Sequence, residues 1–151
     1  MIPLPSSQLR RQALALGMLS VMIAAVGGGG AAQAATCPAR DFAGFFQAFS
    51  DSPAVQRAFT AADVDFTQMD VDAQPEPREV TRNVPLASIV FPIAPTTTEQ
   101  ARQGLETRVT EMSNGMIRAQ LNKPDTDYQL VYIFRARSDC WELYAKVDTS
   151  L

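Results

Sequence analysis

The residues Phe42–Phe49 have the sequence FAGFFQAF, in which phenylalanine occupies the first, fourth, fifth and eighth positions. That spacing predicts an α-helix with one aromatic face. A helix of this length is stable only when tertiary contacts support it. We therefore expect the aromatic face to pack on a β-sheet, and the alternative is that it forms a groove for a partner.

A second short helix is predicted directly downstream of the first. Ser52 suits the N-cap of a helix, and Pro53 suits its first turn. The apolar residues that would form its buried face are Ala54, Val55, Ala58 and Phe59. The folded part of the chain is therefore expected to begin with two helices.

Past the second helix, apolar and polar residues alternate, as they do in half-buried β-strands. Two such runs, residues 63–66 and 69–72, are out of phase by one residue, which predicts a turn or bulge near Thr67-Gln68. A third alternating run, residues 80–86, predicts the next strand.

One more helix is expected before the chain returns to strands. Thr96 and Glu99 have the spacing of a capping box, in which each side chain bonds the other residue's backbone N–H. This predicts a short helix through Gln103 that ends at Gly104.

The rest of the chain is predicted to form strands joined by tight turns. Asn114-Gly115 is typical of a β-hairpin, and residues 128–134 are apolar on both faces, which favours a central strand. The predicted strands cover residues 105–112, 116–121, 128–134 and 141–147, with turns at 123–127 and 135–139.

The order of elements, helices first and then mostly antiparallel strands, defines the fold class. It predicts a single α+β domain over residues 35–151. We expect its N-terminal helices to pack on one face of a curved, mostly antiparallel sheet.

Residues 1–34 have the pattern of a cleaved signal peptide. Arg10 and Arg11 precede the apolar stretch Ala13–Val26, and a small-residue motif then places the cut after Ala34, with Ala35 as second choice. The apolar stretch is shorter than the roughly 20 residues that a membrane-spanning helix needs. The expected location is periplasmic or secreted, with contact to the membrane only during export.

The route of export has two alternatives to the general secretion pathway. The arginine pair resembles a twin-arginine signal, although Leu9 and Ala13 stand where that signal has a hydroxyl and an aromatic residue. A lipoprotein would be modified at Cys37, but the residues before it do not form a lipobox. We therefore place general secretion slightly ahead of the twin-arginine route, and we do not expect lipidation.

Composition excludes several classes of site. The 151 residues contain no His, which rules out Ser-His-Asp and Cys-His nucleophile systems and His-bearing metal sites. The net charge of -3 provides no basic surface for nucleic acid, and removal of Arg10 and Arg11 with the signal peptide makes the chain more acidic. We expect no cofactor, no metal and no nucleic-acid partner.

The chain has two cysteines, Cys37 and Cys140, and both follow the predicted cut. An even number of cysteines in an exported protein favours a disulfide, which would tie the first mature residues to the last strand. Two free thiols are the alternative.

Two segments resemble the ends of an uncharacterised family of bacterial exported proteins, a domain of unknown function. They are residues 42–57, FAGFFQAFSDSPAVQR, and residues 127–150, which contain DYQLVYIF, DCWEL and VDTS. The family is grouped with the nuclear-transport-factor-2-like superfamily, so the resemblance implies a cone-shaped, cystatin-like sheet wrapped over N-terminal helices. It implies an exported setting but no activity, because this fold serves enzymes and binding modules alike.

Carboxylates are the one abundant catalytic side chain. The pairs Asp63/Asp65 and Asp70/Asp72 would each share one face of a strand, and paired carboxylates can act as acid and base. Alternation favours instead a solvated face opposite the apolar residues. An EF-hand is excluded because Gln68 takes the place of the required glycine. We assign no catalytic residue.

In a cone-shaped fold a pocket would lie between the helices and the sheet. Six aromatic residues and two arginines that could orient an acidic ligand group are candidate lining residues: Phe46, Phe59, Phe66, Tyr128, Tyr132, Trp141, Arg118 and Arg135. The favoured alternative is that the aromatic residues fill the core, because a small domain needs them for stability.

These observations predict a non-catalytic binding or envelope-interaction domain. Its partner would be an unidentified envelope protein or a small apolar or acidic ligand. The alternative is a carboxylate-based isomerase or hydrolase of small molecules, which would need a pocket with a buried Asp or Glu of raised pKa.

Overall fold

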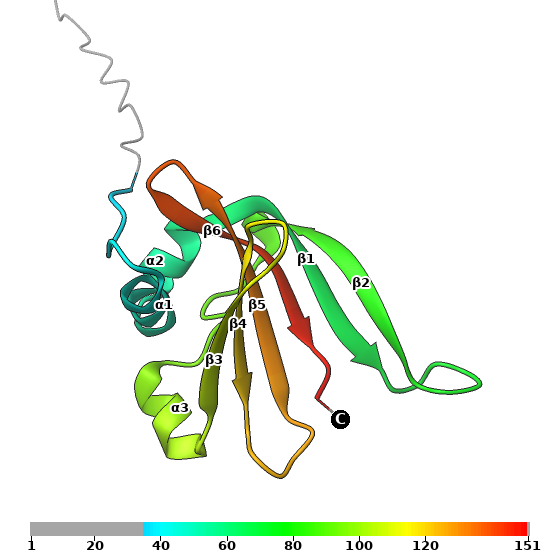
Figure 1. Ribbon diagram of the computed structural model, residues 1–151. Coiled ribbons are helices and arrows are strands. Elements are labelled where there is room, and N and C mark those ends of the chain that lie inside the picture. Colours follow the sequence, from blue (N-terminus) through cyan, green and yellow to red (C-terminus); the bar gives the residue numbers. More distant parts are fainter. Residues whose placement is uncertain (1–34, 151) are drawn as a thin grey trace, which may run out of the picture. The chain divides into compact units, whose positions relative to one another are not determined.

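The computed structural model describes residues 35–150, and the predicted signal peptide and its cleavage site at Ala34 lie outside the described residues. Within these described residues, three α-helices, a 3-10 helix (η1) and six strands follow one another (Figure 1). In order they are α1 (Phe42–Asp51), α2 (Pro53–Ala58), β1 (Thr60–Asp70), β2 (Arg78–Pro85), η1 (Leu86–Ser88), α3 (Thr97–Gln103), β3 (Glu106–Glu111), β4 (Ile117–Asn122), β5 (Gln129–Arg137) and β6 (Cys140–Asp148).

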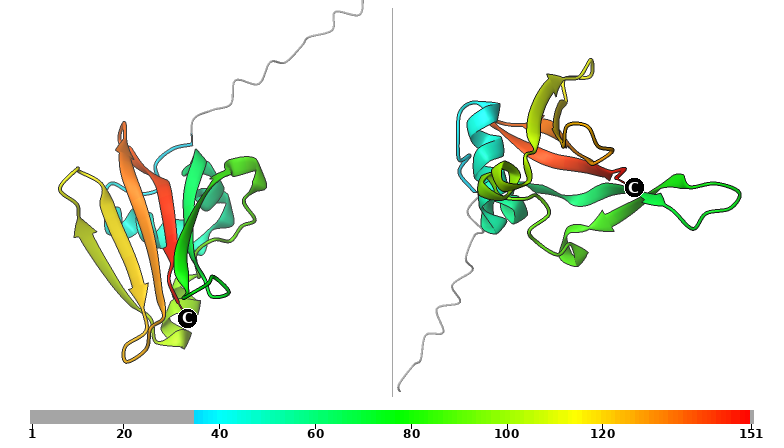
Figure 2. Two further views of the ribbon diagram at one scale, coloured as in Figure 1. Left: turned by 90° about the vertical axis from the view of Figure 1, so that its right-hand side faces the viewer. Right: turned by 90° about the horizontal axis from the view of Figure 1, so that it is seen from below.

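The six strands form one open sheet in the order β2-β1-β6-β5-β4-β3. Four neighbouring pairs are antiparallel, and β1 pairs with β6 in parallel. The last strand therefore lies beside the first and joins the β1–β2 hairpin to the β3–β5 meander, as both views in Figure 2 show. The domain is an α+β protein with a mixed sheet, and β5 has the central position that its apolar sequence predicts.

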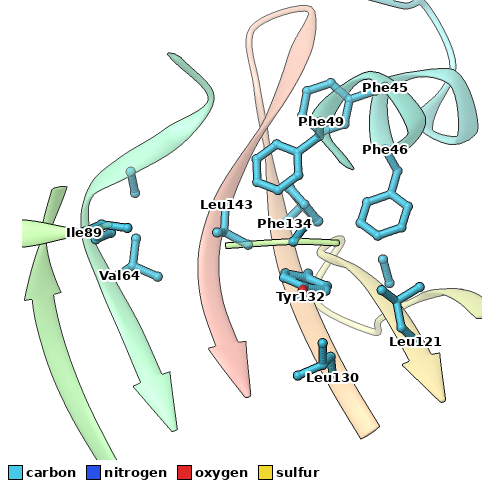
Figure 3. Packing of buried hydrophobic residues seen from close by; sticks show 13 residues of the cluster. Phe45, Phe46, Phe49, Val64, Ile89, Leu121, Leu130, Tyr132, Phe134 and Leu143 are labelled. Atoms are coloured by element: carbon cyan, nitrogen blue, oxygen red, sulfur yellow. The ribbon is translucent and has the colours of Figure 1, made fainter. Parts of the chain in front are cut away.

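Phe134 of β5 is the point where helix α1 meets the sheet (Figure 3). All four α1 phenylalanines have ring centroids within 6.0 Å of the Phe134 ring, and Phe49 lies nearest, at 5.2 Å. Trp141 of β6 adds edge contact to Phe42 at 5.5 Å. The aromatic face of α1 is thus part of the core, because these rings bury one another in tilted and T-shaped pairs.

Strand β1 runs without interruption from Thr60 to Asp70, so the turn or bulge predicted near Thr67-Gln68 is wrong. The phase change in the sequence arises because Val71 has already left the strand and is 58% exposed. The irregularity of β1 lies earlier, between Thr60 and Asp65, where its pairing with β6 shifts.

The turn predicted over residues 135–139 is shorter than expected, because β5 continues to Arg137. Arg135 and Arg137 point to one side of the β5–β6 hairpin and both bind the buried carboxylate of Glu142. The Nη2 of Arg135 lies 2.7 Å from Oε2 of Glu142. This ion pairing holds the strands together past Phe134 and leaves Ser138 and Asp139 to turn the chain.

Helix α3 forms as its sequence predicts. The Thr96 hydroxyl accepts from the Glu99 N–H, while the Thr96 N–H donates to the Glu99 carboxylate at 2.8 Å. Hydrogen bonds from the Thr96 backbone and hydroxyl lower the pKa of Glu99. Gly104 ends the helix in the left-handed region, at φ 68°.

The predicted disulfide between Cys37 and Cys140 is present, and it joins the start of the described chain to the first residue of β6. The Cα atoms of the two residues are 5.5 Å apart. None of the helices within residues 35–150 is long and apolar enough to cross a membrane.

Candidate functional site

A cation–aromatic–cation row crosses the face of the sheet that carries α1. Phe66 of β1 lies opposite Arg82 of β2 on one side and opposite Lys146 of β6 on the other. Lys146 in turn lies opposite Tyr132 of β5, whose ring packs on Phe46 of α1 at 5.9 Å. Directly opposite residues of neighbouring strands share a face, so this row leads from the core to the outer strand.

The outer part of this row borders a hollow of about 400 Å³. Phe66 and the β2 valines supply apolar walls, while Arg82 and Asp70 supply charge at its edges. The complete lining consists of Phe66, Gln68, Met69, Asp70, Val80, Arg82 and Val84. An apolar wall with a few charged groups is the usual composition of a small-molecule site.

Lys146 is half-buried at the inner side of Phe66, with its Nζ 5.9 Å from the centroid of the Phe66 ring. Burial lowers the pKa of the Lys146 ammonium, and the nearby Asp148 carboxylate acts in the opposite direction. Neither ion pair within residues 35–150 includes Lys146. An ammonium that is partly desolvated without an ion-pair partner favours an anion beside it.

A bulge in β6 gives Lys146 this position. Opposite β5, the register steps from Ile133↔Ala145 directly to Phe134↔Leu143, so Tyr144 is the extra residue. Because a bulge reverses the alternation of side chains, Lys146 shares the face of Leu143. Simple alternation would place the two on opposite faces, which is why Lys146 escaped the sequence-based selection.

Two tyrosines limit the site on the side of β5. Tyr132 is fully buried, and its hydroxyl donates to the backbone carbonyl of Ile93 at 3.0 Å. Burial raises the pKa of Tyr132, and the charges of Tyr128 and Asp148 act in the same direction. Burial, followed by the charge of Asp148, also raises the pKa of Tyr128. Tyr132 therefore closes the core instead of lining an open pocket.

The eight residues selected from the sequence do not meet in one cavity. Phe66 borders the hollow described above, and Phe46 borders a separate hollow near α3. Phe59 and Trp141 line a further hollow of about 250 Å³ next to the disulfide. Tyr128 is half-buried and borders none of these three hollows.

The two selected arginines lie away from the hollow at Phe66. Arg118 alternates with the buried Ala119, and Arg135 alternates with the buried Phe134, so both point to the opposite face of the sheet. Arg135 is bound to Glu142, with its Nε donating at 2.9 Å. Arg82 is the arginine that borders the hollow instead, and its place midway between Val80 and Val84, on the same face of β2, is the sequence signal that could have identified it.

The strand carboxylates are mostly on the surface. Asp63, Asp70 and Asp72 are exposed, and the half-buried Asp65 accepts a hydrogen bond from the amide of Asn83 at 2.9 Å. Among these four, Asp70 borders the hollow at Phe66. Residues 35–150 contain no cluster of three side chains arranged to hold a metal ion.

Comparison with known proteins gives a likeness among solved structures but none among family models or curated proteins. No protein-family model and no curated protein matches the chain. Among solved structures, it is similar to a nuclear-transport-factor-2-like protein from Bacteroides fragilis, with 20% sequence identity and a TM-score of 0.47. The match covers 74% of this chain and 47% of that protein, so the chain spans about half of the length of that protein.

Proposed function

We propose that this protein is an exported, non-catalytic binding domain that holds a small amphipathic ligand beside Phe66. The ligand would place its apolar part against Phe66 and the β2 valines and its acidic group between Arg82 and Lys146. The observation that carries the proposal is Lys146, a half-buried ammonium outside every ion pair of residues 35–150 and next to the Phe66 ring.

The charges around the site favour an anion with an apolar body. Arg82 and Lys146 flank Phe66 from the two neighbouring strands, whereas Asp148 lies two residues beyond Lys146 on β6 and Asp70 lies four residues beyond Phe66 on β1. An acidic group beside Phe66 would contact the cations first. This supports the small acidic ligand expected from the sequence. Arg82 and Lys146 would hold it, in place of Arg118 and Arg135.

A nuclear-transport-factor-2-like arrangement is part of the same proposal. In it, the helices cover one face of a cone-shaped sheet, and the uncovered end of that face holds the ligand. The contacts of α1 with Phe134 and Trp141 support this arrangement. We also propose, from the resemblance of residues 42–57 and 127–150, that the chain is related to the exported family of unknown function.

A titration with two ligands of equal chain length and opposite charge tests the proposal. We expect decanoate to bind saturably in isothermal calorimetry and decyltrimethylammonium to bind at least about tenfold more weakly. Equal affinity for the two ligands, or no saturable binding of decanoate, would contradict it.

A carboxylate-based isomerase or hydrolase is the second candidate, because Asp70 borders the same hollow, but Asp70 is exposed and lacks the burial that such an enzyme needs. Asp70→Asn separates the two functions. A binding domain should retain or strengthen its affinity for decanoate in this variant, because a negative charge is removed. An enzyme should lose turnover of its substrate while the fold is unchanged.

Export is tested by the mass of the protein recovered from the periplasm of a bacterial host that produces the full chain. We expect a chain that begins at Ala35. Recovery of the full-length chain from the cytoplasm alone would contradict export.

A further inference from the structure

Strand β3 forms one edge of the sheet and is exposed along its whole length, from Glu106 to Glu111. Its inner edge pairs with β4 residue by residue. Within residues 35–150, no backbone hydrogen bond from another element reaches its outer edge. An exposed edge of this kind carries unpaired N–H and C=O groups that can pair with another strand.

The hollow that Phe46 borders opens beside this edge, between α1, α3 and β3, and has a volume of about 200 Å³. Ala43 and Phe46 of α1 and Val109 of β3 form its apolar walls, and all of its lining residues are uncharged. Val109 is 47% exposed, so part of its apolar side chain is accessible at this edge.

Ser50 and Gln100 are the buried polar residues of this hollow. Ser50 lines the hollow and is 1% exposed, and its hydroxyl has no hydrogen-bond partner within residues 35–150. Gln100, at the α3 side of the same hollow, donates instead to the carbonyl of Pro95 at 2.8 Å.

We propose that an extended peptide segment adds to the sheet along β3 and inserts an uncharged, apolar side chain into the hollow at Val109. The residue opposite Val109 would point to the same face as Val109, and so into the hollow. Glu106 and Glu111 stand at the two ends of β3, so basic residues at the two ends of the peptide complement them. Main-chain pairing supplies affinity in this mode, and the side-chain hollow supplies specificity. This site is separate from the hollow at Phe66 and does not depend on the ligand proposed there.

Blocked heptapeptides of sequence Lys-Thr-Val-X-Val-Thr-Lys, with Leu, Ile or Phe at X, are the probes. We expect saturable binding in fluorescence polarisation for at least one of them, and loss of binding when X is Pro, which has no N–H to donate. In the bound state, amide hydrogen exchange should slow in β3 (Glu106–Glu111) and stay unchanged in β2 (Arg78–Pro85), the opposite edge. Absence of binding up to about 1 mM, or protection of β2 instead of β3, would overturn the proposal.

Two pairs of matched variants test the hollow itself. Ala43→Trp fills it from the exposed side of α1, and Ala54→Trp places the same residue on the exposed side of α2, outside the hollow. Val109→Lys is matched by Val90→Lys, since Val90 is 86% exposed. We expect the first variant of each pair to weaken peptide binding at least about tenfold and the second to leave it unchanged.

Equal effects within each pair would overturn the proposal. So would protection of β3 that grows with protein concentration in the absence of peptide, because the edge would then be occupied by a second copy of the chain.

Discussion

Tyr132 places a hydroxyl within an apolar core, and the carbonyl of Ile93 accepts its hydrogen bond at 3.0 Å. We predict that Tyr132→Phe lowers the free energy of unfolding by about 1 kcal/mol, because the half-buried carbonyl of Ile93 loses its partner. Urea unfolding at neutral pH measures the change, and an unchanged midpoint would show that another group satisfies Ile93.

The same residue predicts an alkaline limit to stability. Because burial raises the pKa of Tyr132, the folded protein keeps a proton that the unfolded chain releases above its tyrosine pKa of about 10. The contribution is complete below about pH 10 and is lost as pH rises above it. Wild type should therefore lose more stability than Tyr132→Phe between about pH 9 and about pH 11, as urea unfolding would measure.

The buried hydrogen bonds of the Gln56 side chain could not be predicted from the sequence. Its amide is fully buried, accepts from the Ile93 N–H at 2.7 Å and donates to the carbonyls of Ser50 and Ala94. Its neighbours Val55 and Ala58 made α2 predictable, but the carbonyls that Gln56 binds come from two separate segments. Glu142 is similar, because its burial depends on two arginines of the facing strand.

At the scale of the element, Gly104 ends α3 with φ 68°, and a Cβ built there would meet nothing within 4 Å. The cost of a substitution is therefore conformational. We predict that Gly104→Ala destabilises the domain by about 1–2 kcal/mol, the cost of the left-handed region for an L-residue. Gly104→Asn should cost less, because Asn tolerates that region. Equal thermal midpoints for both variants and wild type would contradict this explanation.

Elements specified by neighbouring residues could be predicted, and elements specified by distant ones could not. The capping box at Thr96 and the turn at Asn114-Gly115 act within four residues, and both occur as predicted. The parallel pairing of β1 with β6 joins residues about 80 positions apart, and the bulge at Tyr144 appears in the register alone. Because of that bulge, Lys146 points to the face of the sheet that α1 covers. The sequence pattern placed Lys146 on the other face, so it was not selected as a site residue.

At the scale of the whole described domain, the disulfide joins residues 103 positions apart in sequence. We predict that the double variant Cys37→Ser/Cys140→Ser loses about 2–5 kcal/mol of stability, because its unfolded chain is less constrained. Urea unfolding of wild type, reduced wild type and the variant measures this loss. The two disulfide-free forms should agree, and a variant as stable as oxidised wild type would contradict the prediction.

The disulfide could be expected from the even number of cysteines in a chain predicted to be exported. The aromatic core could be expected from the spacing of the phenylalanines and from the alternating patterns of the strands. The selection of pocket residues could not succeed in the same way. The selection placed Tyr132 in the lining of a cavity, whereas Tyr132 is 0% exposed, in line with the favoured alternative that aromatic residues fill the core. The hollow at Phe66 is lined by residues of β1 and β2. These two strands form the hairpin that extends past the helices in Figure 1.

The most direct test of the account compares decanoate binding by Lys146→Gln and Lys123→Gln. Both variants remove one positive charge, but Lys123 is exposed in the β4–β5 turn, away from the hollow at Phe66. We predict that Lys146→Gln weakens binding at least about tenfold and that Lys123→Gln binds as wild type does. Equal affinities for the two variants would contradict the assignment of the binding site to Phe66, Arg82 and Lys146.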